Sequence, residues 1–284
     1  MRAKLALYLK LIRWDKPIGT LLLLWPTLWA LWLAAGGFPG WALLAVFGLG
    51  TFLMRSAGCA VNDVADREFD AHVERTAQRV VATGAVSVRE ALVVAAVLAL
   101  VAGCLALYLN RFALLLCLPA VAVAVAYPFC KRFFAVPQAV LGVAFSFGIP
   151  MAYAAVLDAL PAQMWLLFAA NFAWVMAYDT AYAMSDKPDD LRLGLRTSAI
   201  FFGRFDAAAV LVFEVIFLGL FAGVLLQSQA GLLAWLGFAL GTAYALRLMP
   251  AVFTRSRTAC FKVFLANSHV GMLLWVGLVL DAWR

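Results

Sequence analysis

Charged side chains are scarce in this sequence and make up only 13% of its 284 residues. Soluble domains average about 25% charged and about 45–50% apolar residues. This chain is instead 66% hydrophobic, with a mean hydropathy of +0.96. Such a composition cannot cover a globular surface in contact with water. It excludes intrinsic disorder and a soluble domain, and it indicates that a lipid bilayer is the solvent.

Cysteine and histidine are also few, with five and two residues. The cysteines are odd in number and scattered singly without a C-x-x-C pair, which excludes a disulfide framework and a zinc cluster. We expect them to be small buried apolar residues. His72 and His269 are too far apart in the sequence to form a ligand motif, and we assign them no chemistry.

Long apolar runs fill most of the chain. A transmembrane helix needs roughly 20 mostly apolar residues to cross about 30 Å of hydrocarbon. Nine runs come near this length, at residues 21–35, 41–61, 91–109, 113–127, 139–156, 165–183, 208–226, 232–248 and 264–280. The sequence therefore predicts an all-α multi-pass membrane protein, a bundle of about nine transmembrane helices that forms a single domain over residues 1–284.

Lysine and arginine are concentrated in alternate connections. Twenty of the 22 fall in the amino-terminal arm or in the connections after the second, fourth, sixth and eighth runs. Because basic loops remain in the cytoplasm, we expect a cytoplasmic amino terminus. The same asymmetry explains the net charge of +7, so no nucleic-acid partner is expected.

Nine of the 15 acidic residues gather in two segments at the cytoplasmic ends of the second and sixth runs. In the first segment, Asn62, Asp66 and Asp70 recur every fourth residue and so share one face of a helix. Asp186 and Asp190 repeat this spacing in the second. Stacked like charges destabilise a helix by about 0.2–0.5 kcal/mol per pair, so we expect a bound cation. Oxygen ligands favour Mg²⁺, which keeps coordination places for substrate phosphates. The two segments together predict a metal-bridged diphosphate site at the cytoplasmic side.

The acidic segments have two other interpretations. A solvated acidic loop is the usual explanation of an acidic run, but both segments abut hydrophobic spans and the same spacing occurs twice. A cation transporter could use the acids as a vestibule, although transporters bind near the midplane on broken helices. Basic side chains in the same connections are candidates for phosphate or for an anionic second substrate, with topology or lipid contact as the alternative for each. They are Arg67, Arg75, Arg79, Lys131, Arg132 and Arg196.

Residues 62–70, NDVADREFD, resemble the N-D-x-x-D-x-x-x-D signature of the UbiA-type intramembrane aromatic prenyltransferases. Residues 179–190, DTAYAMSDKPDD, resemble the second aspartate motif of that family. Stretches at 15–19, 127–138 and 194–199 are most similar to its 4-hydroxybenzoate polyprenyltransferase branch, and the likeness spans nearly the whole chain. Val80 stands where relatives usually have proline, and Arg196 where lysine is common.

The resemblance implies Mg²⁺-dependent transfer of a polyprenyl group from polyprenyl diphosphate to the ring carbon ortho to the hydroxyl of 4-hydroxybenzoate, in ubiquinone biosynthesis at the bacterial inner membrane. A different aromatic acceptor is the alternative within the family. Asp66, Asp70, Asp186 and Asp190 would be catalytic and, with Asn62, would bind the metal. Asp63, Asp179 and Asp189 would support these ligands. The implied substrate-binding residues are Arg55, Arg67, Arg79, Tyr127, Lys131, Arg132, Tyr182 and Arg196, with Arg132, Lys131 and Arg55 as alternatives for the aromatic carboxylate. Membrane lipid is the other expected partner.

Overall fold

The computed structural model describes residues 2–130 and 133–283, which form helices and turns without any strand. The predicted all-α class is confirmed. The helices are α1 (Arg2–Leu11), α2 (Ile18–Ala35), α3 (Trp41–Ala65), α4 (Arg67–Asp70), α5 (Val88–Ala106), α6 (Arg111–Cys130), α7 (Pro137–Ser146), α8 (Gly148–Leu157), α9 (Ala162–Arg192), α10 (Ser198–Phe202), the 3₁₀ turn η1 (Gly203–Phe205), α11 (Asp206–Gln227), α12 (Leu232–Phe253) and α13 (Arg257–Asp281).

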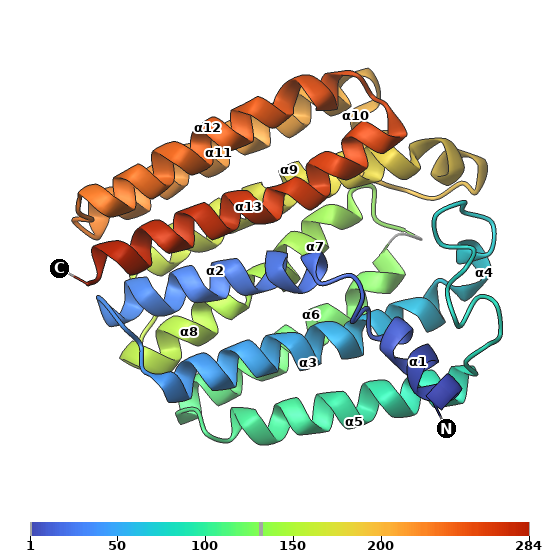
Figure 1. Ribbon diagram of the computed structural model, residues 1–284, viewed down its shortest axis with the longest axis horizontal. Helices are drawn as coiled ribbons and strands as arrows, with labels where there is room; N and C mark the ends of the chain where they lie inside the picture. Colours follow the sequence, from blue (N-terminus) through green and yellow to red (C-terminus); the bar gives the residue numbers. More distant parts are fainter. Residues whose placement is uncertain (1, 131–132, 284) are drawn as a thin grey trace.

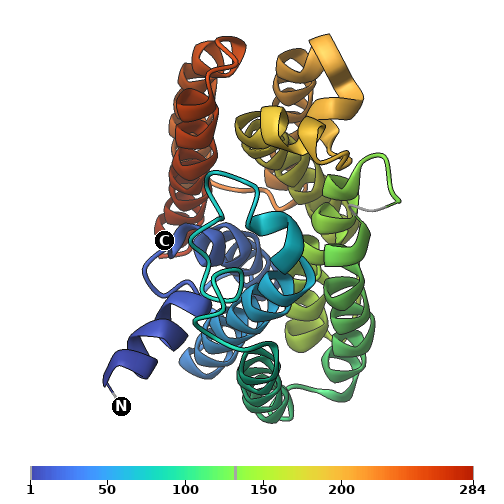
Figure 2. The same cartoon turned by 90° about the vertical axis from the view of Figure 1, so that its right-hand side faces the viewer.

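The long helices lie alongside one another in a bundle (Figure 1). The short helices α1, α4 and α10 gather at one end, and the last turn of α13 lies at the opposite end. Figure 2 looks along the bundle onto the first of these ends, where the connection between α3 and α5 lies in front of the helices. Because α1 and the last turn of α13 lie at opposite ends of the bundle, the chain crosses it an odd number of times.

Eight helical segments of the described residues are long and apolar enough to cross a membrane. Each overlaps one of the predicted runs, and the fifth of them combines α7 with α8. The remaining run, 165–183, lies inside α9, which is not among the eight. Polar residues such as Asn171 and Asp179, together with Trp and Tyr side chains, lie within the run itself and lower the hydropathy of α9. The exact count of nine spans is thus an approximation, with eight strongly apolar segments and one less apolar helix among the described residues.

The centre of the bundle is built on tryptophan. Trp29 of α2 is fully buried, and its ring centroid lies 5.2 Å from that of Trp174 of α9 and 5.2 Å from that of Phe221 of α11. The indole of Trp29 donates to the carbonyl of Gly271 at 3.0 Å, and the indole of Trp174 donates to Asn267 at 3.0 Å. In a bilayer, helices associate through such packing and hydrogen bonds because lipid is as apolar as the side chains. These contacts fix α9 against α2, α11 and α13.

The two acidic segments differ in backbone structure. The helix α3 ends at Ala65, and Asp66, with φ −95° and ψ 3°, separates it from α4, which begins at Arg67. The amide of Asp66 still donates to Asn62 at 2.9 Å and that of Asp70 to Asp66 at 2.8 Å, so the expected four-residue spacing persists across the break. The second segment was expected at the exit of its span but lies on the last turns of α9, whose residues Ala183 and Met184 are buried in an apolar cluster.

Candidate active site

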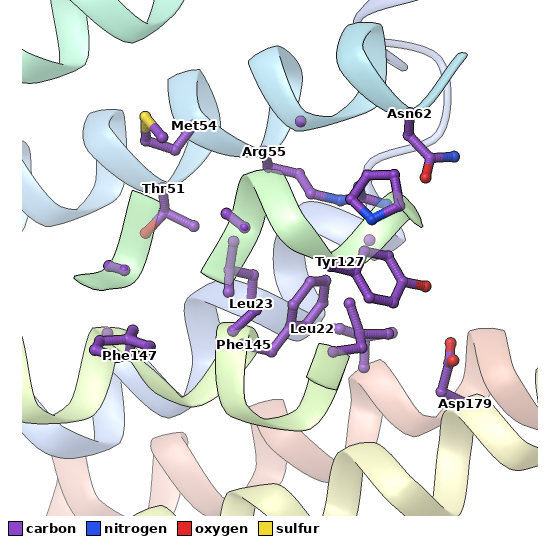
Figure 3. Close-up of a pocket in the computed structure, with 18 of the residues that line it drawn as sticks. Leu22, Leu23, Thr51, Met54, Arg55, Asn62, Tyr127, Phe145, Phe147 and Asp179 are labelled. Atoms are coloured by element: carbon purple, nitrogen blue, oxygen red, sulfur yellow. The ribbon is translucent and has the colours of Figure 1, made fainter. Parts of the chain in front are cut away.

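A cavity of about 490 Å³ lies within the bundle and opens onto residues from α2 to α9 and from α13. In Figure 3, Asn62 and Asp179 lie at one end of it, whereas Met54 and Phe147 lie at the other. Its walls along α5 and α6 are formed by small and apolar side chains. Examples are Ala99, Ala102, Gly103, Ala106, Cys117, Ala120 and Ala124. This arrangement suits a molecule with a charged head and a hydrocarbon tail.

Asn62, Asp66 and Asp70 of the first segment line this cavity. Asp66 and Asp70 are buried, and Asp66 accepts a hydrogen bond from the amide nitrogen of Asn62 at 3.2 Å. The other side-chain atom of Asn62, Oδ1, is buried and has no hydrogen-bond partner among the described residues. An orphaned acceptor oxygen in such a place is an unsatisfied ligand position.

The second segment lines the same cavity through Asp179, Asp186 and Asp190 of α9. All three are buried. The guanidinium of Arg75, in the connection after α4, donates to Asp186 through Nη2 at 2.6 Å and through Nε at 3.1 Å. The two acidic segments, more than 100 residues apart in the sequence, therefore meet at one cavity wall.

Arginine side chains balance part of this negative charge. Asp70 accepts from Arg79 at 2.6 Å, and the buried Asp63 accepts from Arg13 at 2.5 Å and lies 3.3 Å from Arg79. Burial raises the pKa of Asp70 above its ordinary range, and the Arg79 guanidinium offsets only part of that effect. A further positive charge beside Asp70 would therefore be stabilised.

The donor set fits a magnesium ion that is shared with a phosphate ligand. No three His, Cys, Asp or Glu side chains of residues 2–130 and 133–283 are close enough to hold a metal by themselves. Carboxylate and amide oxygens from α3, α4 and α9 nevertheless border one space, and no donor from residues 2–130 or 133–283 reaches Asn62 Oδ1. Mg²⁺ is commonly bound by one or two carboxylates together with substrate phosphates rather than by a complete protein cage.

Arg55 is an unusual cation because it belongs to the apolar span α3 and lines the cavity. Its side chain extends from α3 along the cavity toward Tyr127 (Figure 3). The Nε atom is buried without a hydrogen-bond partner among the described residues, and Cζ lies 5.9 Å from the ring centroid of Phe145. Ionisable groups inside a span are costly and usually functional. Arg55 is thus placed to receive an anion that enters the cavity.

Both predicted aromatic residues line the cavity, whereas two of the predicted basic residues do not. Tyr127 and Tyr182 are on its wall, and the Arg75 Cζ lies 4.5 Å from the ring centroid of Tyr182. Arg67 is 50% exposed and pairs with Glu68 at 3.4 Å. Arg196 is exposed and donates to the carbonyl of Phe133 at 2.6 Å. Neither Arg67 nor Arg196 borders the cavity.

Lys131 and Arg132, expected to bind substrate, lie outside the described residues. Of the supporting acids, Asp179 is on the cavity wall, whereas Asp63 and Asp189 are not. Asp189 instead accepts from Arg257 at 2.9 Å.

Several residues at the site were not among the expectations. Gln138 and Thr197 are buried on the cavity wall, and Gln138 accepts from the amide of Ser198 at 2.8 Å. Both residues belong to stretches that carry the family resemblance, Gln138 to 127–138 and Thr197 to 194–199, and this membership could have marked them as site residues. Arg257 donates to both Glu74 and Asp189 at 2.9 Å and so links the connection after α4 to the end of α9. No local pattern marks Arg257.

Residues 23–277 match the sequence profile of the UbiA prenyltransferase family. A curated 4-hydroxybenzoate octaprenyltransferase of Aromatoleum aromaticum is 54% identical over 281 residues, covering 99% of this chain and 96% of that protein. Another, of Paracidovorax citrulli, is 56% identical over 283 residues and covers 98% and 94%.

Solved structures show the same fold. The apo structure of a UbiA homologue from Aeropyrum pernix K1 aligns with a TM-score of 0.82 at 25% identity, covering 93% of this chain and 98% of that one. A UbiA homologue from Archaeoglobus fulgidus, bound to GPP and Mg²⁺, aligns with a TM-score of 0.68 at 20% identity, covering 94% and 99%. The chain belongs to the UbiA prenyltransferase family.

Proposed function

We propose that this protein transfers a polyprenyl group from polyprenyl diphosphate to the ring carbon ortho to the hydroxyl of 4-hydroxybenzoate, in ubiquinone biosynthesis. The observation that carries the proposal is the single cavity on which both aspartate motifs meet an apolar wall. Full-length identity of 54–56% to proteins named 4-hydroxybenzoate octaprenyltransferase supports the acceptor. Because these relatives are transferases, an enzyme is favoured over a cation transporter.

The diphosphate head would bind at the polar end of the cavity. Asn62, Asp66, Asp70, Asp186 and Asp190 would hold Mg²⁺, which when bound supplies positive charge against the charge that develops on the departing diphosphate. Arg75 and Arg79 would donate charge-assisted hydrogen bonds to the terminal oxygens of the diphosphate. Both guanidiniums already lie among these carboxylates. The prenyl tail would lie against the apolar walls of α5 and α6.

The aromatic acid would bind with its carboxylate on Arg55, because the guanidinium is on the cavity wall and its Nε is buried without a hydrogen-bond partner among the described residues. In the reaction, the allylic C–O bond breaks and the diphosphate leaves with the electron pair. The faces of Tyr127 and Tyr182 would stabilise the allylic cation. The ortho carbon donates its electron pair to form the C–C bond, and the ring proton passes to a carboxylate or to the released diphosphate.

The distribution of lysine and arginine supports a proposal for the placement of the protein in the cell. We propose a bacterial inner-membrane protein whose amino terminus and active site are cytoplasmic, formed as one domain over residues 1–284. In support, α1 and the connection that holds Arg75 and Arg79 lie at the same end of the bundle (Figure 1).

Radiolabelled 4-hydroxybenzoate tests the proposal in membranes supplied with polyprenyl diphosphate. We expect a lipid-soluble product that requires Mg²⁺ and is lost in Asp66→Asn and Asp186→Asn. Asp158→Asn is the matched control, because Asp158 is an exposed residue that follows α8 and does not line the cavity. Transfer that persists in both active-site variants would refute the site, and an active enzyme that prenylates another phenol but not 4-hydroxybenzoate would refute the acceptor.

A further inference from the structure

We propose that Gly19 is a specificity-determining residue, which keeps the Arg55 guanidinium in position to bind the carboxylate of the aromatic acceptor. The inference rests on the proposed function, since it concerns how that function selects an acid over a neutral phenol. Gly19 acts through Arg55 and is a positioning residue.

Gly19 lies in the first turn of α2 and lines the same cavity as Arg55 of α3. A Cβ atom at position 19 would lie 2.7 Å from Arg55 Nη2, 3.1 Å from Nε and 3.3 Å from Cζ. Real Cβ atoms essentially never approach another heavy atom within 3.0 Å. The guanidinium therefore occupies the space that any side chain at position 19 would require.

The backbone gives no separate reason for glycine at this position. Gly19 is not among the glycines with positive φ, such as Gly36 and Gly40, so its conformation is open to any residue. Glycine inside a helix is also less stable than alanine. The room that it leaves for Arg55 is the one contact that explains it here.

The surroundings of Arg55 leave it available to a ligand. On the cavity wall, Arg75 donates to Asp186 and Arg79 donates to Asp70. Arg55 instead packs against the backbone of Gly19 and faces the ring of Phe145 at 5.9 Å, with its Nε unpartnered among the described residues. The space beside Gly19 and the ring of Phe145 hold the Arg55 guanidinium in place, so its N–H donors stay available for a carboxylate of the ligand.

An alanine at position 19 would displace the guanidinium rather than unfold the bundle, because the clashing atoms are the far end of a flexible side chain. Charge-assisted hydrogen bonds to a carboxylate depend on geometry and weaken when misaligned. We expect Gly19→Ala to raise the KM and the Kd for 4-hydroxybenzoate about tenfold, with the KM for polyprenyl diphosphate changed by less than about twofold. Use of the methyl ester, which has no carboxylate, should stay unchanged, so that discrimination between acid and ester falls.

A double-mutant cycle separates this role from a structural one. The proteins are the wild type, Gly19→Ala, Arg55→Ala and the double variant, with Gly48→Ala as control because Gly48 lies on α3, has open space for a Cβ and does not line the cavity. Kinetics in membranes are paired with equilibrium binding of 4-hydroxybenzoate to purified protein. In the Arg55→Ala background, the change at position 19 should alter Kd by less than about twofold.

Two results would overturn the inference. One is an unchanged Kd in Gly19→Ala, and the other is a tenfold loss that persists after Arg55 is removed. The proposed function fails separately, if the wild type binds 4-hydroxybenzoate but transfers no prenyl group to it. Absence of 4-hydroxybenzoate binding by the wild type would overturn both.

Discussion

Arg75 donates three hydrogen bonds to Asp186, from Nη2 to Oδ2 at 2.6 Å and from Nε to Oδ1 at 3.1 Å and to Oδ2 at 3.2 Å. They connect the segment after the first aspartate motif to the second motif, 111 residues further along the chain. Burial lowers the pKa of Arg75, but the neighbouring Tyr182 and Asp186 outweigh it and raise the pKa above the ordinary value, so the guanidinium stays charged. The pair brings a fixed positive charge to the place where we locate the diphosphate.

Replacing Arg75 should therefore impair turnover more than folding. We expect Arg75→Leu to lower kcat/KM for polyprenyl diphosphate by about 10- to 100-fold, because it removes charge-assisted hydrogen bonds. Arg75→Lys should retain part of the activity, since it keeps the charge but not the two-pronged geometry. Steady-state kinetics in membranes measure both. Arg89→Leu, an exposed change in the first turn of α5, is the control, and wild-type kinetics in Arg75→Leu would contradict the assignment.

Arg257 should matter through Asp189 rather than through Glu74. The Glu74 side chain is 81% exposed and that of Asp189 only 8%, although both lie 2.9 Å from Arg257. Exposed ion pairs contribute about 0–1 kcal/mol, whereas a buried carboxylate left without its partner is costly. Arg257→Ala should lower the melting temperature in detergent by about 3 °C, and Glu74→Ala by less than about 1 °C. Equal shifts in the two variants would show that the exposed pair carries the effect.

The contact between α12 and α13 depends on glycine. A Cβ on Gly237 would lie 2.6 Å from the Cα of Gly277 and 2.8 Å from the carbonyl oxygen of Leu273, both of which are backbone atoms. Forcing the helices apart should cost about 1–3 kcal/mol. We expect Gly237→Ala to lower the melting temperature, while Gly219→Ala, with nothing within 4 Å of the added atom, should leave it unchanged or raise it. A stable Gly237→Ala protein would mean that the helices can separate without loss.

The apolar wall predicts selective effects on long prenyl donors. Gly103 of α5 lines the cavity and has no atom within 4 Å of an added Cβ. A leucine at this position would fill space that we assign to the tail. Gly103→Leu should reduce transfer from octaprenyl diphosphate about tenfold and leave transfer from geranyl diphosphate within about threefold. Product analysis with both donors measures the ratio, and an equal effect on the two would place the tail elsewhere.

Local periodicity was sufficient to find the acidic part of this site. Asp66 and Asp70, like Asp186 and Asp190, keep a four-residue spacing, which places each pair on one face whatever the rest of the chain does. Arg67 shows that a position next to a site residue in the sequence does not predict a position at the site. It follows Asp66 directly, but successive residues of a helix point about 100° apart, and its side chain leaves the cavity for solvent.

Contacts between distant segments could not be predicted in this way. Arg13 reaches Asp63 across 50 residues and Arg257 reaches Asp189 across 68, and no spacing rule connects either pair. The space that Gly19 leaves for Arg55 likewise exists only once α2 lies against α3. Hydropathy found the apolar runs, but it could not show that α9 continues as a helix to Arg192, because its last turns carry charged side chains both toward the cavity, at Asp186 and Asp190, and away from it, at Lys187 and Asp189.

The central claim is that both aspartate motifs hold one metal-bound diphosphate. An experimental structure with Mn²⁺ in place of Mg²⁺ and an unreactive prenyl thiodiphosphate tests it most directly, since anomalous scattering locates the metal. We predict that the metal and the diphosphate of one bound ligand contact both the Asn62–Asp66–Asp70 group and the Asp186–Asp190 group. A ligand and metal held by one motif alone, with the other facing solvent, would contradict the account.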